Sequence, residues 1–182
     1  MTSSSLRVLF LCTGNSARSI LGEALLRRLA SEGSEAHTFD AYAFDSYAFD
    51  AYAFDSRSAG ARPTGRVHPD SLRLLQEDYA IDASGASSKS IEDLGDWQPD
   101  LVITVCDDAA ETCPIWPGET AVAHWGLPDP AAVDDSAERM EVFRHVAEVL
   151  LQRLQRLVAI ENLHQLDRSQ LAAAVSALAT PI

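Results

Sequence analysis

The 182-residue chain has few basic residues, few cysteines and no long apolar run. Lys and Arg total 14 against 27 Asp and Glu, so the net charge is −13, which argues against a nonspecific nucleic-acid binder because such proteins need a basic surface. No apolar run approaches the roughly 20 residues of a membrane span, and Val8–Leu11 is too short for the core of a signal peptide. Three cysteines are too few, and odd in number, for a disulfide scaffold. We therefore expect a cytoplasmic protein with neither a nucleic-acid partner nor a membrane partner.

The pattern of apolar segments predicts one α/β domain with a parallel sheet. Strands are expected at Arg7–Leu11, Asp100–Val105 and Ala121–His124. Helices are expected after the turn cluster at residues 13–16, from His68-Pro69 to Tyr79, briefly over Ser90–Leu94, and over Ser136–Val158 and Arg168–Leu178. In such sheets sites form at the carboxyl ends of strands, where Cys12, Cys106 and the loop after His124 all lie.

A pentapeptide recurs over residues 38–57. Its copies place Phe39, Phe44, Phe49 and Phe54 five residues apart, each followed by Asp. Because five is odd, a single strand would turn successive copies to opposite faces of a sheet. We expect one copy to form a strand and the others to form a protruding hairpin or loop, either as a tolerated duplication or as an aromatic arm for oligomerisation.

The segment around Cys12 has the features of an oxyanion-binding loop. A loop that curls into a helix N-terminus directs backbone N–H groups at one point, where a tetrahedral oxyanion fits. Gly14 and Asn15 tolerate left-handed backbone angles, and Arg18 offers a planar fork of donors. The same charges favour the thiolate of Cys12, to which Ser19 can donate, so that Cys12 is a candidate nucleophile. The predicted oxyanion-binding residues are Thr13, Gly14, Asn15, Ser16, Ala17, Arg18 and Ser19.

Four stretches resemble the low-molecular-weight protein tyrosine phosphatase fold, and within it the thiol-dependent arsenate reductases. They are Val8–Ser19, Ser58-Ala59-Gly60, Gly65–Pro69 and His124–Pro130. The resemblance covers about residues 6–158, apart from the repeat. It implies a phosphatase-like domain over 1–158, with a four-stranded parallel sheet flanked by helices, an inserted repeat at 38–57 and a C-terminal helical extension at 159–182.

The two branches of this family differ in their demand for electrons. Phosphoester hydrolysis needs one cysteine, whereas reduction of arsenate to arsenite takes two electrons, which thiols supply by forming a disulfide. Cys106 and Cys113 lie in a segment, Thr104–Pro114, that looks like the redox segment of thioredoxin-coupled arsenate reductases. The resemblance implies a relay in which Cys12 attacks arsenate, Cys106 attacks Cys12 and Cys113 attacks Cys106. Thioredoxin, or glutathione with glutaredoxin, would then reduce the final disulfide.

The spacing of the second and third cysteines predicts a conformational change. Were residues 106–113 wholly helical, the two cysteine Cα atoms would be about 10 Å apart. A disulfide requires about 4.4–6.8 Å. We therefore expect this segment to unwind during turnover and to be the mobile element of the molecule.

The resemblance also implies that Asp129, between Pro128 and Pro130, is the general acid for the departing oxygen. Phosphatases of this fold usually carry an aromatic residue after the Asp-Pro pair. Here Ala131 and Ala132 follow, which favours a small inorganic oxyanion over an aryl phosphate. Arsenate reduction is the first hypothesis, phosphotyrosine or small-phosphoester hydrolysis the second, and a non-catalytic oxyanion sensor the third.

Some members of this family bind potassium beneath the loop. Residues that could match such ligands are Asn15, Glu23 and Ser58. Lys89 stands where an acidic ligand would be useful, and its ammonium could replace the ion. We therefore expect neither a metal nor a bound cofactor, and we expect His124 and Trp125 to pack and form hydrogen bonds near the site.

Overall fold

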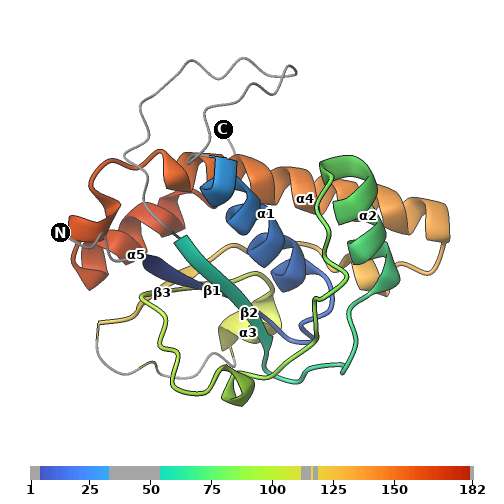
Figure 1. Cartoon of the computed structure of the whole chain (residues 1–182), viewed down its shortest axis with the longest axis horizontal. Helices are drawn as coiled ribbons and strands as arrows, with labels where there is room; N and C mark the ends of the chain where they lie inside the picture. The colour runs from blue at the N-terminus through green and yellow to red at the C-terminus, as the bar shows by residue number, and fades with distance from the viewer. Residues whose placement is uncertain (1–4, 33–53, 112–115, 117–118, 181–182) are drawn as a thin grey trace.

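The fold is built on a four-stranded parallel sheet, as predicted. The structure is a computed structural model that describes residues 5–32, 54–111, 116 and 119–180. The strands are β1 (Leu6–Cys12), β2 (Phe54–Gly60), β3 (Leu101–Thr104) and β4 (Ala121–His124). They pair in parallel in the order β2-β1-β3-β4 (Figure 1).

The burial of each strand explains its sequence. Residues Val8–Leu11 of β1 and Leu101–Ile103 of β3 have no exposed surface, because helices cover both faces of the central strands. These strands therefore read as continuous apolar runs. β4 lies at the edge, where buried Ala121 and Ala123 alternate with the exposed Val122.

Five helices surround the sheet in the described part of the chain. They are α1 (Arg18–Glu32), α2 (Pro69–Tyr79), α3 (Asp107–Glu111), α4 (Ser136–Val158) and α5 (Arg168–Ala177), with short 3₁₀ turns at Glu92–Leu94, Pro130–Ala132 and Leu163–Gln165. The four longer predicted helices are confirmed. The short helix expected over Ser90–Leu94 is only the 3₁₀ turn at Glu92–Leu94, and α3 was not predicted. Asp135 caps α4 by accepting two backbone N–H groups, and Asp167 caps α5 in a capping box with Gln170.

Different helices pack against different parts of the sheet. α1 packs against α4 and β2, and α2 packs against the first half of α4. α4 runs the length of the molecule in Figure 1, while α5 packs against the edge strand β4. No helix among the described residues is long and apolar enough to cross a membrane.

The repeat contributes one strand. β2 begins at Phe54, so the last copy of the pentapeptide leads into a strand, as expected for one copy. The other copies, at residues 38–53, lie outside the described residues.

Candidate active site

The predicted site residues on the described part of the chain gather at one edge of the sheet. β1 lies between β2 and β3, so the chain leaves Cys12 at the point where the strand order reverses, which is where open α/β sheets bind ligands. Cys12 pairs in register with Gly60 at the end of β2, and Cys106 follows β3. The sequence-predicted positions of Cys12, Cys106 and the loop after β4 at strand ends are thus confirmed.

The loop at residues 12–18 turns its carbonyl groups outward. Four amide N–H groups of residues 61–68 donate to the carbonyl oxygens of residues 12, 13, 14 and 16 at 2.8–3.1 Å. Within the described chain, the N–H groups of Thr13, Gly14, Ser16 and Ala17 have no hydrogen-bond partner. With its acceptors occupied and its donors available, the loop is suited to bind an anion.

The Cys12 sulfur receives two hydrogen bonds inside this loop. Asn15 N–H lies 3.1 Å from Cys12 Sγ, and Ser19 Oγ lies 2.9 Å from it. Because Ser19 Oγ also accepts from Asn15 Nδ2 at 2.9 Å, its own proton is directed to the sulfur. Cys12 is buried, with 3% of its surface exposed, and two donors aimed at its sulfur stabilise a negative charge there.

Of the two loop residues that tolerate left-handed angles, only Asn15 adopts them. Asn15 has φ of 45° and is fully buried, and its Oδ1 accepts from Lys89 N–H at 2.8 Å, which fixes this conformation. Gly14 does not have a positive φ, so the curl of the loop uses the left-handed conformation at Asn15 and not at Gly14. A glycine suits this position because a Cβ would lie 3.1 Å from Thr64 Cγ2.

Arg18 and Asp129 form an ion pair over the loop. Arg18 Nη2 lies 3.0 Å from Asp129 Oδ2, and Arg18 Nη1 donates to Leu127 O at 3.0 Å. The Arg18 side chain is 11% exposed and that of Asp129 is 45% exposed. The guanidinium at the start of α1 thus holds the loop that follows β4 over the oxyanion-binding loop.

Cys106 is joined to the loop through Thr13. Thr13 Oγ1 lies 3.4 Å from Cys106 Sγ, and Cys106 is 4% exposed. Cys12 and Cys106 are both free thiols. α3 begins directly after Cys106, while Cys113 lies outside the described residues, so the predicted unwinding of 106–113 stays a prediction.

His124 and Trp125 form hydrogen bonds beside the site, as expected. His124 Nδ1 lies 2.8 Å from Thr104 Oγ1, and its Nε2 lies 3.2 Å from Asp107 Oδ1 at the start of α3. The Trp125 ring is fully buried, and its Nε1 donates to Val175 O of α5 at 2.9 Å. The loop that carries Asp129 is thereby anchored to α5.

His68 lies beside the loop and begins α2. Its N–H donates to Ser16 O at 2.9 Å, and its Nδ1 accepts from Asp70 N–H at 3.1 Å. Burial is the main cause that lowers the pKa of His68, with further lowering by nearby arginine charges and an opposing effect of Asp70 and Asp129. The imidazole therefore favours the neutral form, which suits an acceptor at Nδ1.

A polar cluster lies beneath the loop. Ser58 Oγ donates to Glu23 Oε2, and Lys89 Nζ lies 3.4 Å from Ser58 Oγ and 3.5 Å from Glu23 Oε2. Lys89 thus places its ammonium beside two of the three oxygen-bearing side chains that could match potassium ligands. The described residues contain no group of three or more His, Cys, Asp or Glu side chains that could hold a metal.

Sequence reasoning missed the residues that support the loop from outside. Ser88 Oγ donates to Gly14 O at 3.0 Å and accepts from Gly65 N–H at 3.2 Å, and Thr64 N–H donates to Gly14 O. These contacts join positions more than 20 residues apart, so local patterns could not reveal them. The one available signal was the serine-rich segment at residues 84–90.

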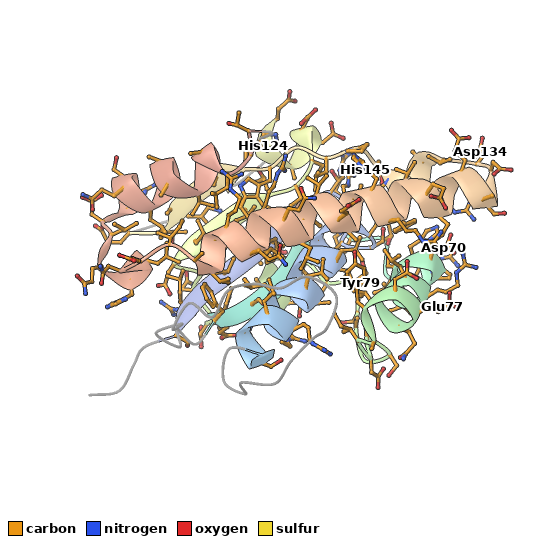
Figure 2. All side chains as sticks on the ribbon, turned by 90° about the horizontal axis from the view of Figure 1, so that it is seen from above. Asp70, Glu77, Tyr79, His124, Asp134 and His145 are labelled. Atoms are coloured by element: carbon orange, nitrogen blue, oxygen red, sulfur yellow. The ribbon has the colours of Figure 1, made fainter. Side chains whose placement is uncertain are left out.

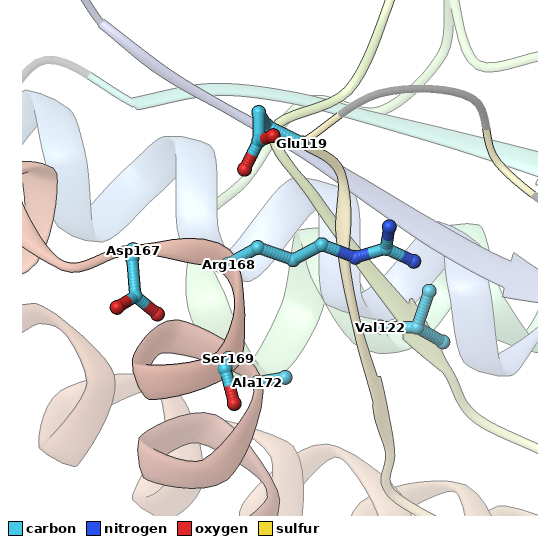
Figure 3. A pocket seen from close by; sticks show the side chains of 6 residues that line it. All are labelled: Glu119, Val122, Asp167, Arg168, Ser169 and Ala172. Atoms are coloured by element: carbon cyan, nitrogen blue, oxygen red, sulfur yellow. The ribbon is translucent and has the colours of Figure 1, made fainter.

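An open depression lies elsewhere on the molecule. Its lining residues are Glu119, Val122, Asp167, Arg168, Ser169 and Ala172, and Figure 3 shows Arg168 extending across it from α5. Glu119 precedes β4, so the depression lies toward the amino end of that strand, away from Cys12. It has no thiol and belongs to neither the loop nor the redox segment.

Comparison with known proteins agrees with this geometry. The family model for low molecular weight phosphotyrosine protein phosphatase matches residues 7–171. The chain belongs to this family. Among curated members, it is 32% identical over 148 residues to an arsenate reductase of Halalkalibacterium halodurans, covering 81% of this chain and 91% of that protein. It is 33% identical over 124 residues to an arsenate reductase of Staphylococcus aureus, covering 68% and 78% of the two chains.

Solved structures of the family have the same fold. An arsenate reductase in a phosphate-binding state aligns with a TM-score of 0.62 at 26% identity, covering 85% of this chain and 97% of that chain. A thioredoxin-dependent arsenate reductase of Corynebacterium glutamicum aligns with a TM-score of 0.53 at 27% identity, covering 85% and 64%. A low molecular weight protein tyrosine phosphatase of T. tengcongensis, at 22% identity and a TM-score of 0.62 over 85% and 98% of the chains, shares the fold.

Proposed function

We propose that this protein reduces arsenate to arsenite through a relay of its three cysteines. The observation that carries the proposal is the second thiol at the site, because Cys106 contacts Thr13 of the oxyanion-binding loop. Phosphoester hydrolysis has no use for that thiol, whereas a two-electron reduction requires it. Relatives named arsenate reductase, at about a third identity over most of the chain, support the same reaction.

Binding would begin with exchange of partners at Arg18. An arsenate in the loop would accept hydrogen bonds from the free N–H groups. It would also draw the Arg18 guanidinium away from Asp129. Asp129 would then be released from its ion pair with Arg18 and could act on the departing oxygen. Cys12 attacks the arsenic atom, a sulfur–arsenic bond forms, and the departing oxygen takes a proton from Asp129 and leaves as water.

The reduction follows when a second thiolate attacks the first sulfur. Cys106 attacks Cys12 Sγ, the sulfur–arsenic bond breaks, and its electron pair passes to arsenic, which leaves as arsenite. Cys113 then attacks Cys106, which frees the Cys12 thiolate and leaves a disulfide between residues 106 and 113. An external dithiol of the thioredoxin type returns both thiols, and glutathione with glutaredoxin is the alternative reductant.

The proposal is tested by coupling turnover to NADPH consumption with thioredoxin and thioredoxin reductase. The wild type is expected to consume NADPH in an arsenate-dependent way. Cys106→Ser should abolish multiple turnover yet keep any hydrolysis of an aryl phosphate, while Cys12→Ser should abolish both. Cys113→Ser should complete one turnover and accumulate a disulfide between Cys12 and Cys106. Full arsenate turnover by Cys106→Ser would contradict the relay.

Hydrolysis of phosphoesters is the second candidate. The loop, Arg18 and Asp129 are the parts that such a reaction uses, and the family includes phosphatases. The 3₁₀ turn after Asp129 is Pro-Ala-Ala, so no aromatic side chain follows the acid to stack on a phenyl ring. Arsenate therefore remains the preferred substrate.

A further inference from the structure

Three segments that meet around Cys12 contain no acidic residue. They are residues 12–22, 56–69 and 83–91, which carry five of the 14 basic residues and none of the 27 Asp and Glu. The rest of the chain holds nine basic residues against all 27 acidic ones. In a protein of net charge −13, positive charge is thus concentrated along the segments that surround the nucleophile.

Hydrogen bonds fix the three segments to one another. Arg62 N–H donates to Thr13 O at 2.8 Å, which joins the segment after β2 to the loop. Ser88 Oγ donates to Gly14 O at 3.0 Å and accepts from Gly65 N–H at 3.2 Å. The acid-free segments are therefore neighbours in space, and Arg62 itself contacts the loop through its backbone N–H.

Two of the five basic residues have no acidic partner among the residues that the structure describes. The three with a partner are Arg18, Arg57 and Lys89. Arg62 and Arg66 are exposed, and neither forms an ion pair with any residue that the structure describes. No carboxylate of the described residues lies within ion-pair distance of either guanidinium group.

Arg66 lies within electrostatic range of the site. The pKa of His68 is lowered mainly by burial, and the charges of Arg139 and Arg66 lower it further, against Asp70 and Asp129. His68 itself donates its N–H to the loop at residue 16. The charge of Arg66 and that of the candidate general acid thus reach the same imidazole beside the loop.

We propose that Arg62 and Arg66 form a cationic approach that draws small dianionic oxyanions to Cys12. The overall charge repels such anions, and a local positive potential offsets that repulsion where the substrate enters. Arsenate is the natural anion only if the proposed function holds; the electrostatic role does not depend on it. The two residues increase the local concentration of the anion and take no part in the chemical step.

The test compares alkylation of Cys12 by iodoacetate, an anion, and by iodoacetamide, a neutral reagent of similar shape. The ratio of the two rate constants cancels changes in thiolate reactivity and isolates the local potential. At 10 mM ionic strength, where the Debye length is about 30 Å, Arg62→Gln/Arg66→Gln should lower this ratio by on the order of tenfold. At 1 M ionic strength, where the Debye length is about 3 Å, the double variant and the wild type should have nearly the same ratio. Peptide mass analysis assigns the label to residue 12.

Arg62→Gln and Arg66→Gln are also measured singly, and Arg156→Gln is the matched control for each of them. Arg156 is near the end of α4, 17 residues from Arg139, which is about 25 Å along the helix. The control should keep the wild-type ratio, and thermal unfolding should show that all variants fold alike. An unchanged ratio in the double variant, or an equal fall in the control, would overturn the inference.

Steady-state kinetics with arsenate separate this inference from the proposed function. The double variant should raise KM for arsenate at low ionic strength and leave kcat unchanged. If the protein does not reduce arsenate but the alkylation ratio falls, the proposed function fails and the cationic approach stands. If the protein reduces arsenate but the double variant changes neither the alkylation ratio nor KM, the cationic approach is refuted and the proposed function stands.

Discussion

Gly60 ends β2 beside the loop and has no room for a side chain. A Cβ there would lie 2.8 Å from Thr13 O and 3.0 Å from Asn15 N, and both are backbone atoms of the loop. Backbone that is fixed by several hydrogen bonds cannot move aside cheaply. We expect Gly60→Ala to lower the free energy of unfolding by about 1–3 kcal/mol, and to weaken binding of phosphate or arsenate to the loop. Urea unfolding and calorimetric titration measure the two effects.

Gly85→Ala is the control for this prediction. A Cβ at Gly85 would meet no atom within 4 Å, and the residue does not have a positive φ. This variant is expected to be neutral or to gain about 0.4–1 kcal/mol, because alanine restricts the unfolded chain. Equal stability and equal anion affinity for Gly60→Ala and wild type would show that the loop is not rigid at Asn15.

At the scale of single residues, sequence reasoning succeeded where the contacts are local. Ser19, Asn15 and Arg18 lie within seven residues of Cys12, and the structure brings all of them to the sulfur or over the loop. The pairing of His124 with Asp107 depends on the register of β3 and β4 and the course of the chain beyond them. One-dimensional spacing does not contain that information.

At the scale of elements, the junction of α2 and α4 depends on a buried carboxylate. Asp70 Oδ2 accepts from Arg139 Nε at 2.8 Å, and its side chain is 13% exposed (Figure 2). The hydrogen bond from Arg139 is the largest cause that lowers the pKa of Asp70, against the opposing effect of burial, and the charge of Arg73 lowers it further. The ionised carboxylate therefore stabilises the folded state.

The sign of the pH dependence follows from this lowered pKa. The contribution of Asp70 is fully present above its unfolded pKa of about 3.9, and it is lost as the pH falls through the lower folded value. We expect Asp70→Asn to lower the free energy of unfolding by about 1–2 kcal/mol at pH 7. This difference in stability between the variant and the wild type should narrow below about pH 3.5. Urea midpoints from pH 7 to pH 2.5 measure this difference. Glu77→Gln, at an exposed position of α2, should have the stability of the wild type at pH 7. If the stability difference between Asp70→Asn and the wild type did not change with pH, the stabilising role of the Asp70 carboxylate would be refuted.

Elements with strong local signals could be predicted closely. α4 has the predicted bounds, because an Asp cap precedes a long amphipathic pattern. α3 was missed because five residues with three acids show no helical periodicity, and its formation depends on contacts with β1 and β3. The strand after the repeat could be predicted, but the choice of copy could not, because all copies share one pattern.

At the scale of the whole molecule, excess negative charge opposes folding. A net charge of −13 destabilises the compact state through self-repulsion, and salt screens that repulsion. We expect 0.5 M KCl to raise stability by about 1 kcal/mol, which corresponds to about 2–4 °C in Tm for a chain of this size. Differential scanning calorimetry measures the shift. Near the isoelectric point of about 4.6 the same salt should have little effect, and an equal shift at both pH values would point to a cause other than charge.

The indole of Trp125 gives the molecule an optical signal of its own. It has no contact with solvent, bonds to the last helix at Val175, and begins the stretch of chain that ends at the candidate acid. The fluorescence emission of a buried indole shifts to longer wavelength when water reaches the ring. In the variant Trp97→Phe/Trp116→Phe, which keeps Trp125 alone, a shift of that kind on adding an oxyanion would mean that anion binding loosens the contact between Trp125 and α5. The absence of a shift would mean that Asp129 moves while Trp125 stays in place.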